Sequence, residues 1–191
     1  MINRGMDKHG QFFLIAAVII IAVIVSIVTI TNYTQKRDVV RLYDLGEELG
    51  IESQQVLDYG TYSELNESEM TDLIKNFIDN YVNYIEEDKN IYFVFGNKLK
   101  INVVGYQDIQ YENVTVCLKL DDKGKTEQCN PYLAIGETQE FTEENEEEIY
   151  KVEVQIEGNS YEFPLSYGEN FYFVIWQEIG GEKHVVTSPT E

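Results

Sequence analysis

The sequence of 191 residues has few basic side chains for its size, and this shortage excludes one large class of partners. Lysine and arginine number 14 against 34 aspartates and glutamates, which gives a formal net charge of -20. A surface this negative repels the phosphates of nucleic acids and the headgroups of anionic lipids. We therefore expect no nucleic-acid partner. The ordinary role of such a charge is solubility, while a divalent cation or a basic partner is the sharper alternative.

Histidine and cysteine are equally scarce, at two each. His9 and His184 have no neighbouring histidine or cysteine in the sequence, and two sulfurs alone supply only half of a typical zinc site. The sequence also lacks the motifs G-x-S-x-G, H-E-x-x-H and G-x-G-x-x-G, and it has no P-loop. We therefore expect no metal site, no cofactor and no catalytic residue.

Proline is also scarce, at 3, but apolar residues make up 43% of the chain, so a folded domain is expected. The longest apolar run, Phe12 to Ile30, contains only Ser26 and Thr29 as polar residues. As a helix it would be about 28 Å long, close to the hydrocarbon thickness of a bilayer. A cleaved secretory signal has a shorter core, of about 7–15 residues, and a small-residue cleavage site. We therefore predict a membrane helix.

The residues that open this run, KHGQFF at 8–13, resemble the processing site of archaeal class III signal peptides, which occur on type IV pilin-like proteins. The resemblance implies that a prepilin-type peptidase cleaves between Gly10 and Gln11, after the basic lead that contains Lys8. It also implies a helix that stays in the membrane or packs in a filament with other pilin-like subunits. Many such proteins carry a glutamate near the start of the mature helix, and Ile15 stands there in this chain. An uncut anchor is the alternative.

A second apolar stripe follows within residues 38–60. Its members recur at helical spacing, at Leu42, Leu45, Leu49 and Val56. We therefore predict one helix from Phe12 to about Tyr59, with a length of about 70 Å. Gly46 and Gly50 either allow close helix contact or mark a weak point, and we expect Gly60 to cap the end of the helix.

An amphipathic helix is predicted next, packed against a sheet. Asn66 followed by Glu69 is a capping arrangement. Apolar side chains then recur on one helical face, at Met70, Leu73, Ile74, Phe77, Ile78, Tyr81 and Ile85.

From Ile91 to residue 188 the apolar period changes to two, which predicts about eight or nine short antiparallel strands. Two-residue turns at Gly96–Asn97, Gly158–Asn159 and Gly180–Gly181 predict three hairpins. Facing residues in a hairpin have a constant sum of residue numbers, so each turn also predicts a register that sets apolar residues opposite one another. The predicted pairs are Tyr92–Ile101 and Val94–Leu99, then Val152–Leu165, Val154–Phe163 and Ile156–Tyr161, and finally Trp176–Val185, Gln177–His184 and Glu178–Lys183.

A fourth hairpin turns around Lys123 and brings the two cysteines together. In its register Cys117 faces Cys129, and facing α-carbons in an antiparallel pair are about 4.5–5.5 Å apart, within reach of a disulfide. Two buried thiols are the alternative. A disulfide belongs outside the cytosol. Basic residues flank the membrane helix on both sides, so the charge distribution does not predict its orientation. The expected disulfide does: it predicts a cytoplasmic N-terminus and an extracellular C-terminal domain.

Other polar patterns carry weaker predictions. Asn66 and Asn113, together with Asn32 close to the membrane, match the N-glycosylation triplet. The run 136–150 holds seven glutamates and no basic residue. We expect it to be a solvated loop between strands, with a weak Ca²⁺ or Mg²⁺ site as the alternative. The segment LDDKGK at 120–125 is expected to be a turn.

Together these features predict an α+β chain with a sandwich-like, antiparallel β-rich head. Its expected parts are a cytoplasmic leader at 1–10, a transmembrane helix at 11–31, a helical stalk at 32–60, an amphipathic helix segment at 61–90 and an extracellular β domain at 91–191. We expect a pilin-like or minor-pilin-like surface protein, anchored in the membrane, with a structural or assembly role. One alternative is a monomeric, membrane-tethered extracellular binding module that touches the cell-wall layer. The other is an anchored enzyme.

Overall fold

The computed structural model describes residues 8–85, 89–106, 114–120, 127–132, 139–144, 148–156 and 158–188. These residues form two helices, α1 (Lys8–Tyr62) and α2 (Glu67–Tyr84), and then only strands. The strands are β1 (Asn90–Gly96), β2 (Lys100–Tyr106), β3 (Val114–Lys119), β4 (Glu127–Tyr132), β5 (Gln139–Glu144), β6 (Lys151–Ile156), β7 (Asn159–Pro164), β8 (Asn170–Ile179) and β9 (Glu182–Thr187). The chain divides into two compact units, Met1–Arg41 and Leu42–Glu191.

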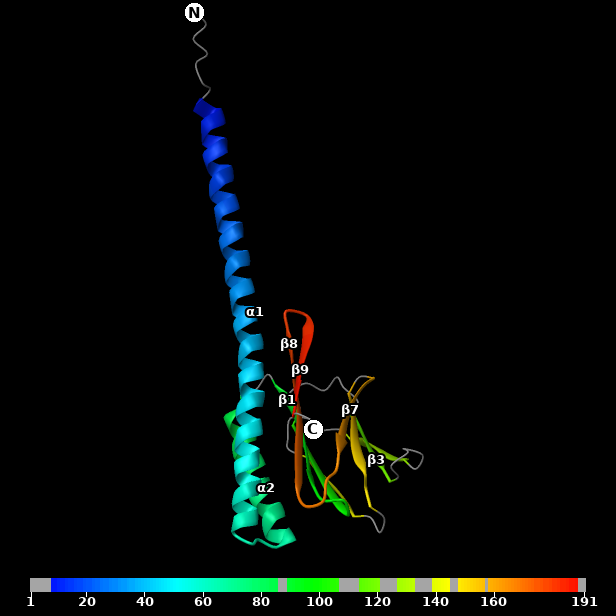
Figure 1. Ribbon diagram of the computed structural model, residues 1–191. Coiled ribbons are helices and arrows are strands. Elements are labelled where there is room, and N and C mark those ends of the chain that lie inside the picture. The colour runs from blue at the N-terminus through cyan, green and yellow to red at the C-terminus, as the bar shows by residue number, and fades with distance from the viewer. Residues whose placement is uncertain are drawn as a thin grey trace, which may run out of the picture. The chain divides into compact units, whose positions relative to one another are not determined.

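The second unit has three layers (Figure 1). The second half of α1 forms the first layer with α2, and a five-stranded antiparallel sheet in the order β5-β2-β1-β8-β9 forms the next. The third layer is a four-stranded antiparallel sheet in the order β4-β3-β6-β7. Successive side chains of β1 alternate between two cores: Tyr92 and Val94 lie between the sheets, whereas Phe93 and Phe95 lie under the helices. The predicted α+β class, with a sandwich and a packed amphipathic helix, is confirmed.

The two helices of this unit follow the predicted patterns. Leu42 and Leu49 of α1 are fully buried. At the start of α2, the Asn66 side chain accepts a hydrogen bond from the Glu69 backbone, and the Glu69 side chain accepts one from the Asn66 backbone. This reciprocal cap satisfies two donors that the helix cannot satisfy itself. The Tyr81 hydroxyl donates to the Leu45 carbonyl at 3.0 Å and so joins α2 to α1.

Gly60 does not cap α1, contrary to the prediction. The helix continues to Tyr62, and the chain reverses at Glu64, which has a φ of 51°. Gly60 instead lies against Met70 of α2, where an added Cβ would be 2.4 Å from the Met70 sulfur. The absence of a side chain therefore serves the close approach of the two helices rather than the end of the first.

Two of the predicted hairpin registers are confirmed. Cys117 faces Cys129 in the β3–β4 pair. Trp176 faces Val185 in the β8–β9 pair, with the other predicted partners in step. Both pairs are therefore in the register that the turn residues and the apolar alternation predicted.

The predicted β1–β2 register is wrong by four in the sum of residue numbers. Val94 faces Val103 rather than Leu99, because the turn occupies residues 97–100 instead of Gly96 and Asn97. Strand β1 is buried on both faces, so apolar alternation does not distinguish between registers there. The polar contacts of the turn, described below, decide the register instead.

The predicted β6–β7 register is wrong by two. Val154 faces Tyr161 rather than Phe163, because Asn159 is already part of β7 and Gly158, with a φ of 81°, supplies the turn. A shift of two leaves every side chain on its predicted face. The prediction therefore has the right faces and the wrong partners.

The sequence predicted that the acidic run 136–150 is a loop, and this prediction is wrong for the middle of the run. Its middle forms the strand β5, which pairs with β2 at the edge of the five-stranded sheet. An edge strand has one neighbour and tolerates acidic side chains, which also block further pairing. The segments 133–138 and 145–147, like 121–126, lie outside the described residues.

Candidate functional sites

The apolar part of α1 is the first candidate site, and it belongs to the first unit. An 18-residue window of this helix has a mean hydropathy of 3.3, and none of it is buried. A helix with this length and composition could form a single membrane span. Its exposed large apolar side chains between Phe13 and Ile30 would then be covered by lipid or by other helices.

The hydroxyl groups in and just after this segment are satisfied within the helix. Each donates to the carbonyl four residues earlier, at 2.7 to 3.1 Å: Ser26 to Ala22, Thr29 to Val25, Thr31 to Ile27 and Thr34 to Ile30. A polar group without a partner is costly in hydrocarbon. These bonds make the segment compatible with a membrane interior.

The residues of the predicted processing site lie at the start of α1. Lys8 is its first residue, so Gly10 and Gln11 fall within its first turn. Ile15, in the place of the glutamate common in the proteins the segment resembles, is 58% exposed. The predicted cleavage bond therefore precedes the exposed apolar segment directly.

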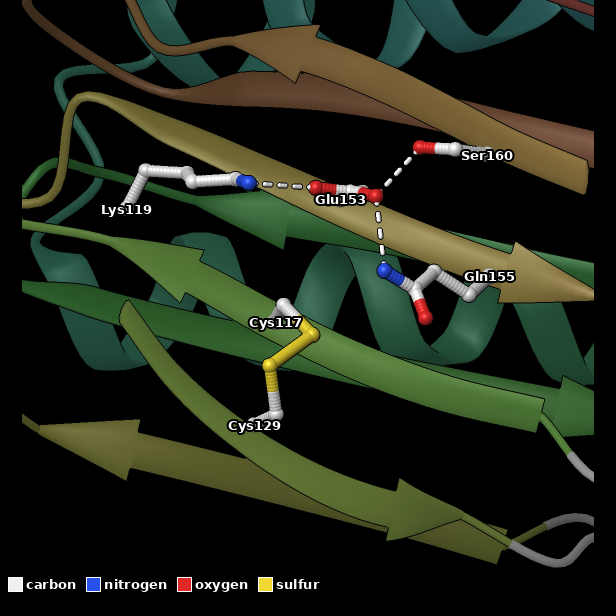
Figure 2. Close-up of a disulfide and its surroundings, with 6 residues drawn as sticks. All are labelled: Cys117, Lys119, Cys129, Glu153, Gln155 and Ser160. Carbon is white, nitrogen blue, oxygen red and sulfur yellow. Dashed lines mark hydrogen bonds and ion pairs between the residues drawn. A yellow bond between two sulfur atoms is a disulfide. The ribbon is translucent and has the colours of Figure 1, made fainter. Parts of the chain in front are cut away.

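The disulfide lies on the four-stranded sheet of the second unit (Figure 2). Cys117 of β3 and Cys129 of β4 are bonded to each other and are cross-strand partners. Cys117 is fully buried, whereas Cys129 is exposed. Val116 and Leu118, on either side of Cys117, point into the core between the sheets. The disulfide is therefore on the opposite, outer face of β3.

A polar cluster on the same outer face is centred on Glu153 of β6, which is 6% exposed and faces Cys117 directly. Its carboxylate forms an ion pair with Lys119 at 2.6 Å and accepts hydrogen bonds from Gln155, at 2.8 Å, and from Ser160 (Figure 2). Burial alone would raise the pKa of Glu153, but these partners outweigh it and lower the pKa to about 2. Glu153 is therefore a stable anion at neutral pH and a poor general base.

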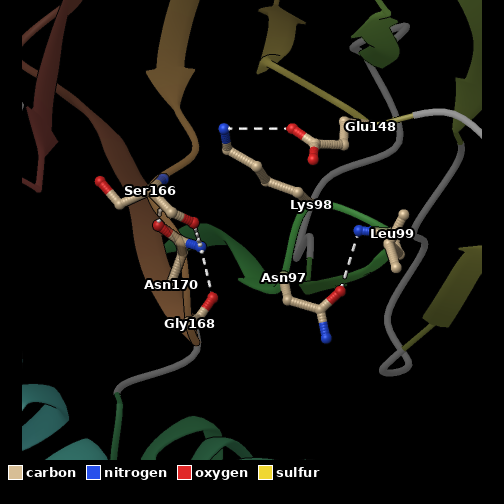
Figure 3. A network of polar contacts seen from close by, with 7 residues as sticks. All are labelled: Asn97, Lys98, Leu99, Glu148, Ser166, Gly168 and Asn170. Atoms are coloured by element: carbon tan, nitrogen blue, oxygen red, sulfur yellow. Dashed lines mark hydrogen bonds and ion pairs between the residues drawn. The ribbon is translucent and has the colours of Figure 1, made fainter.

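The β1–β2 turn forms a second polar cluster (Figure 3). The Asn97 side-chain oxygen accepts hydrogen bonds from the backbone of Leu99 at 2.9 Å and of Lys100 at 3.0 Å. Lys98, whose side chain is 13% exposed, lies 3.5 Å from Glu148 and 4.0 Å from the ring centre of Tyr167. A carboxylate and an aromatic face are both favourable for an ammonium group. This cluster joins the turn to two other loops.

Asn170, at the start of β8, stabilises the adjoining loop. Its side-chain oxygen accepts from the Ser166 backbone at 2.9 Å, and its amide donates to the carbonyls of Ser166 and Gly168 at 3.1 Å each (Figure 3). The amide also donates to the Gly96 carbonyl at 3.1 Å. Asn170 is buried. Both amide hydrogens and the side-chain oxygen are thus engaged with the backbone, which gives Asn170 a structural role in this loop.

A groove of about 1030 Å³ lies entirely within the second unit, between α1 and the β8–β9 side of the five-stranded sheet. Tyr43, Asp44, Glu47 and Gly50 line its helix wall, and Glu169 lies on the opposite wall. Burial raises the pKa of Glu169, and the charge of Glu67 adds to this effect, while a hydrogen bond from Asn97 opposes it. The described lining residues include no lysine, arginine or histidine.

The remaining predicted residues do not gather into a site. Asn66 is engaged in the cap of α2, Asn32 is exposed in α1, and Asn113 lies outside the described residues. His184 is half-buried opposite Gln177. Within the described parts of the chain, no three histidine, cysteine, aspartate or glutamate side chains are close enough together to hold a metal ion.

Comparison with known proteins gives no relatives: the chain matches no protein-family model, no curated protein and no solved structure.

Sequence reasoning missed the groove and the Lys98 cluster. The groove is formed by residues more than a hundred positions apart, so no local pattern indicates it. Lys98 is brought to Tyr167 by the pairing of β1 with β8, which no hairpin rule predicts. One available signal was the absence of lysine and arginine from residues 42–74, which marks an acidic helical surface.

Proposed function

We propose that this chain is a pilin-like or minor-pilin-like subunit, anchored in the membrane and carrying its β-rich domain on the extracellular side, with a structural or assembly role. The observation that carries the proposal is helix α1. It begins at the KHGQFF segment, continues through an exposed apolar stretch, and ends as part of the core of the second unit. The partners implied are the membrane, a prepilin-type peptidase, and other pilin-like subunits or the cell-wall layer.

The orientation part of the proposal depends on the disulfide. A bond between Cys117 and Cys129 persists in an oxidising compartment and is rare in the cytosol. The net charge of -20 also favours a domain that stays in solution beside an anionic membrane rather than lying on it. An extracellular head and a cytoplasmic leader agree with both observations.

The experiment is N-terminal mass spectrometry of the protein isolated from its host. A mature chain that begins at Gln11 supports the proposal, and a chain that still contains Lys8 contradicts it. Gly10→Val should abolish cleavage, and Gly5→Val, at the other glycine of the leader, is the matched control that should leave it intact. Orientation is tested separately with Tyr167→Cys, since Tyr167 is 82% exposed: a membrane-impermeant maleimide should label it on intact cells.

The alternative is a membrane-tethered extracellular binding module that acts as a monomer. The observation that favours it is the groove in the second unit, because ligand sites are concave and combine aromatic with a few polar side chains. An uncut leader, an extracellular head and a monomeric protein in mild detergent would together favour this alternative.

A further inference from the structure

The groove in the second unit has the shape of a site for an elongated partner. Its helix wall extends from Tyr43 to Leu57, which is about 21 Å of helix at a rise of about 1.5 Å per residue. Gly50 lies in the middle of this wall, and an added Cβ there would have no atom within 4 Å. The groove is thus open above Gly50, whereas Gly46, one turn earlier, is closed off by Val186.

The charge of the groove selects a cationic partner. Asp44 and Glu47 line one wall and Glu169 lines the other, and no basic side chain is among the described residues that line it. Burial raises the pKa of Glu169, and a cation in the groove beside this carboxyl group would favour its charged form. Tyr43, which is 53% exposed on the same wall, adds an aromatic face suited to an ammonium or guanidinium group.

A segment with this chemistry exists in the chain itself. Lys36 and Arg37 are exposed in α1, and residues 31–35 separate them from the apolar stretch that ends at Ile30. From residue 42 to residue 74 the sequence has no further basic residue. Helix α1 therefore carries a basic segment followed by an acidic one, so two copies have complementary charges when one is displaced along the helix direction relative to the other.

We infer that the groove receives the Lys36–Arg37 segment of α1 from a second copy of this chain, an inference that rests on the proposed assembly role. The mode is that of a helix in a groove, with the basic side chains as anchors. Arg37 can bind a carboxylate through two parallel hydrogen bonds. Lys36 supplies a second charge beside Glu47.

The test is disulfide cross-linking between co-expressed full-length variants in cell-surface preparations. The native cysteines are already bonded to each other, so single introduced cysteines report the contact. One variant carries Val40→Cys and the other Ile51→Cys; both positions are exposed, and both leave Lys36, Arg37 and Glu47 in place. The matched control replaces Ile51→Cys by Asn80→Cys, on an exposed position of α2 outside the groove. We expect a cross-linked dimer with Ile51→Cys and none with Asn80→Cys.

Two further variants show whether the groove and its charge are responsible. Gly50→Phe in the Ile51→Cys chain places a large side chain where an added Cβ has no atom within 4 Å, and it should abolish the cross-link. Glu47→Lys in that chain should also abolish it, and Lys36→Glu in the Val40→Cys partner should restore it. A missing cross-link, an equal one in the control, or one that persists with Gly50→Phe overturns the inference. The N-terminus of the same sample is sequenced in parallel: a chain that begins at Gln11 without the cross-link refutes this contact and leaves the proposed function standing.

Discussion

Gly46 of α1 lies so close to Val186 of β9 that a Cβ on the glycine would be 2.3 Å from the Val186 Cγ1 atom. Gly50, one turn later on the same helix, has open space at the same position. We predict that Gly46→Ala lowers the free energy of unfolding by about 1–3 kcal/mol through overpacking. Gly50→Ala should instead raise it by about 0.5–1 kcal/mol, because alanine favours the helix. Thermal unfolding of both full-length variants in detergent, followed by circular dichroism, checks the pair; equal shifts would contradict the packing described.

The buried ion pair on the four-stranded sheet predicts a loss of stability in acid. Glu153 has a pKa of about 2 in the folded protein against an ordinary value of 4.5. Its contribution is fully present above about pH 4.5 and is lost as the pH falls through about 2. Glu169, whose pKa is raised, acts in the opposite direction, since its protonation favours the folded state.

A variant separates the contribution of Glu153 from those of the other carboxylates. Glu153→Gln should lower the free energy of unfolding at pH 7 by about 3 kcal/mol, because Lys119 loses its carboxylate in a largely buried place. It should also flatten the pH dependence between about pH 4.5 and 2. Urea unfolding at several pH values measures both effects. An unchanged pH profile would show that the ion pair does not persist in solution.

The disulfide between Cys117 and Cys129 closes a short loop, with a sequence separation of 12. We predict that its reduction lowers the free energy of unfolding by about 3 kcal/mol, mainly by freeing the unfolded chain. The fold should persist, because β3 is also paired with β6 on its other side. Calorimetry with and without a reductant measures the shift, and the Cys117→Ser/Cys129→Ser double variant, which should be insensitive to the reductant, is the control.

Lys98 and Lys151 test whether the distance of an ion pair or its surroundings decides its energy. Lys151 lies 3.0 Å from Glu162, but both side chains are about half exposed, whereas Lys98 lies 3.5 Å from Glu148 with only 13% of its side chain exposed. We predict that Lys98→Met costs about 1–2 kcal/mol, because it also loses its contacts with two tyrosine rings. Lys151→Met should cost less than about 1 kcal/mol. Thermal unfolding compares the two, and the reverse order would refute the cluster around Lys98.

The helices and two hairpins were predictable because their signals are local. The cap of α2 needs only Asn66 and Glu69, three residues apart, and the β8–β9 hairpin needs a Gly180–Gly181 turn between two alternating strands. The cysteine pair was predictable because its register follows from arithmetic on one hairpin. In each case the residues that decide the structure are close together in the sequence.

The features that were not predicted depend on residues far apart in the sequence. One face of strand β1 packs under the helices and the other packs against the second sheet, so both faces are apolar. Its register with β2 is set by the Asn97 turn instead. Gly60 was predicted to end the helix because glycine often does so. Its actual role, close contact with Met70 of the next helix, cannot be seen from the neighbouring sequence. Strand β5 looked like a loop because its composition is acidic, and it is held in place by its backbone pairing with β2. The groove, whose walls come from α1 and the β8–β9 strands, follows from the assembled layers alone.

The inward hydrogen bonds of Ser26, Thr29, Thr31 and Thr34 give α1 a practical freedom. Because these hydroxyl groups are hydrogen-bonded within the helix, they need no new partners when the surroundings of the helix change. The segment could therefore move between lipid and contact with other helices while keeping all four hydrogen bonds.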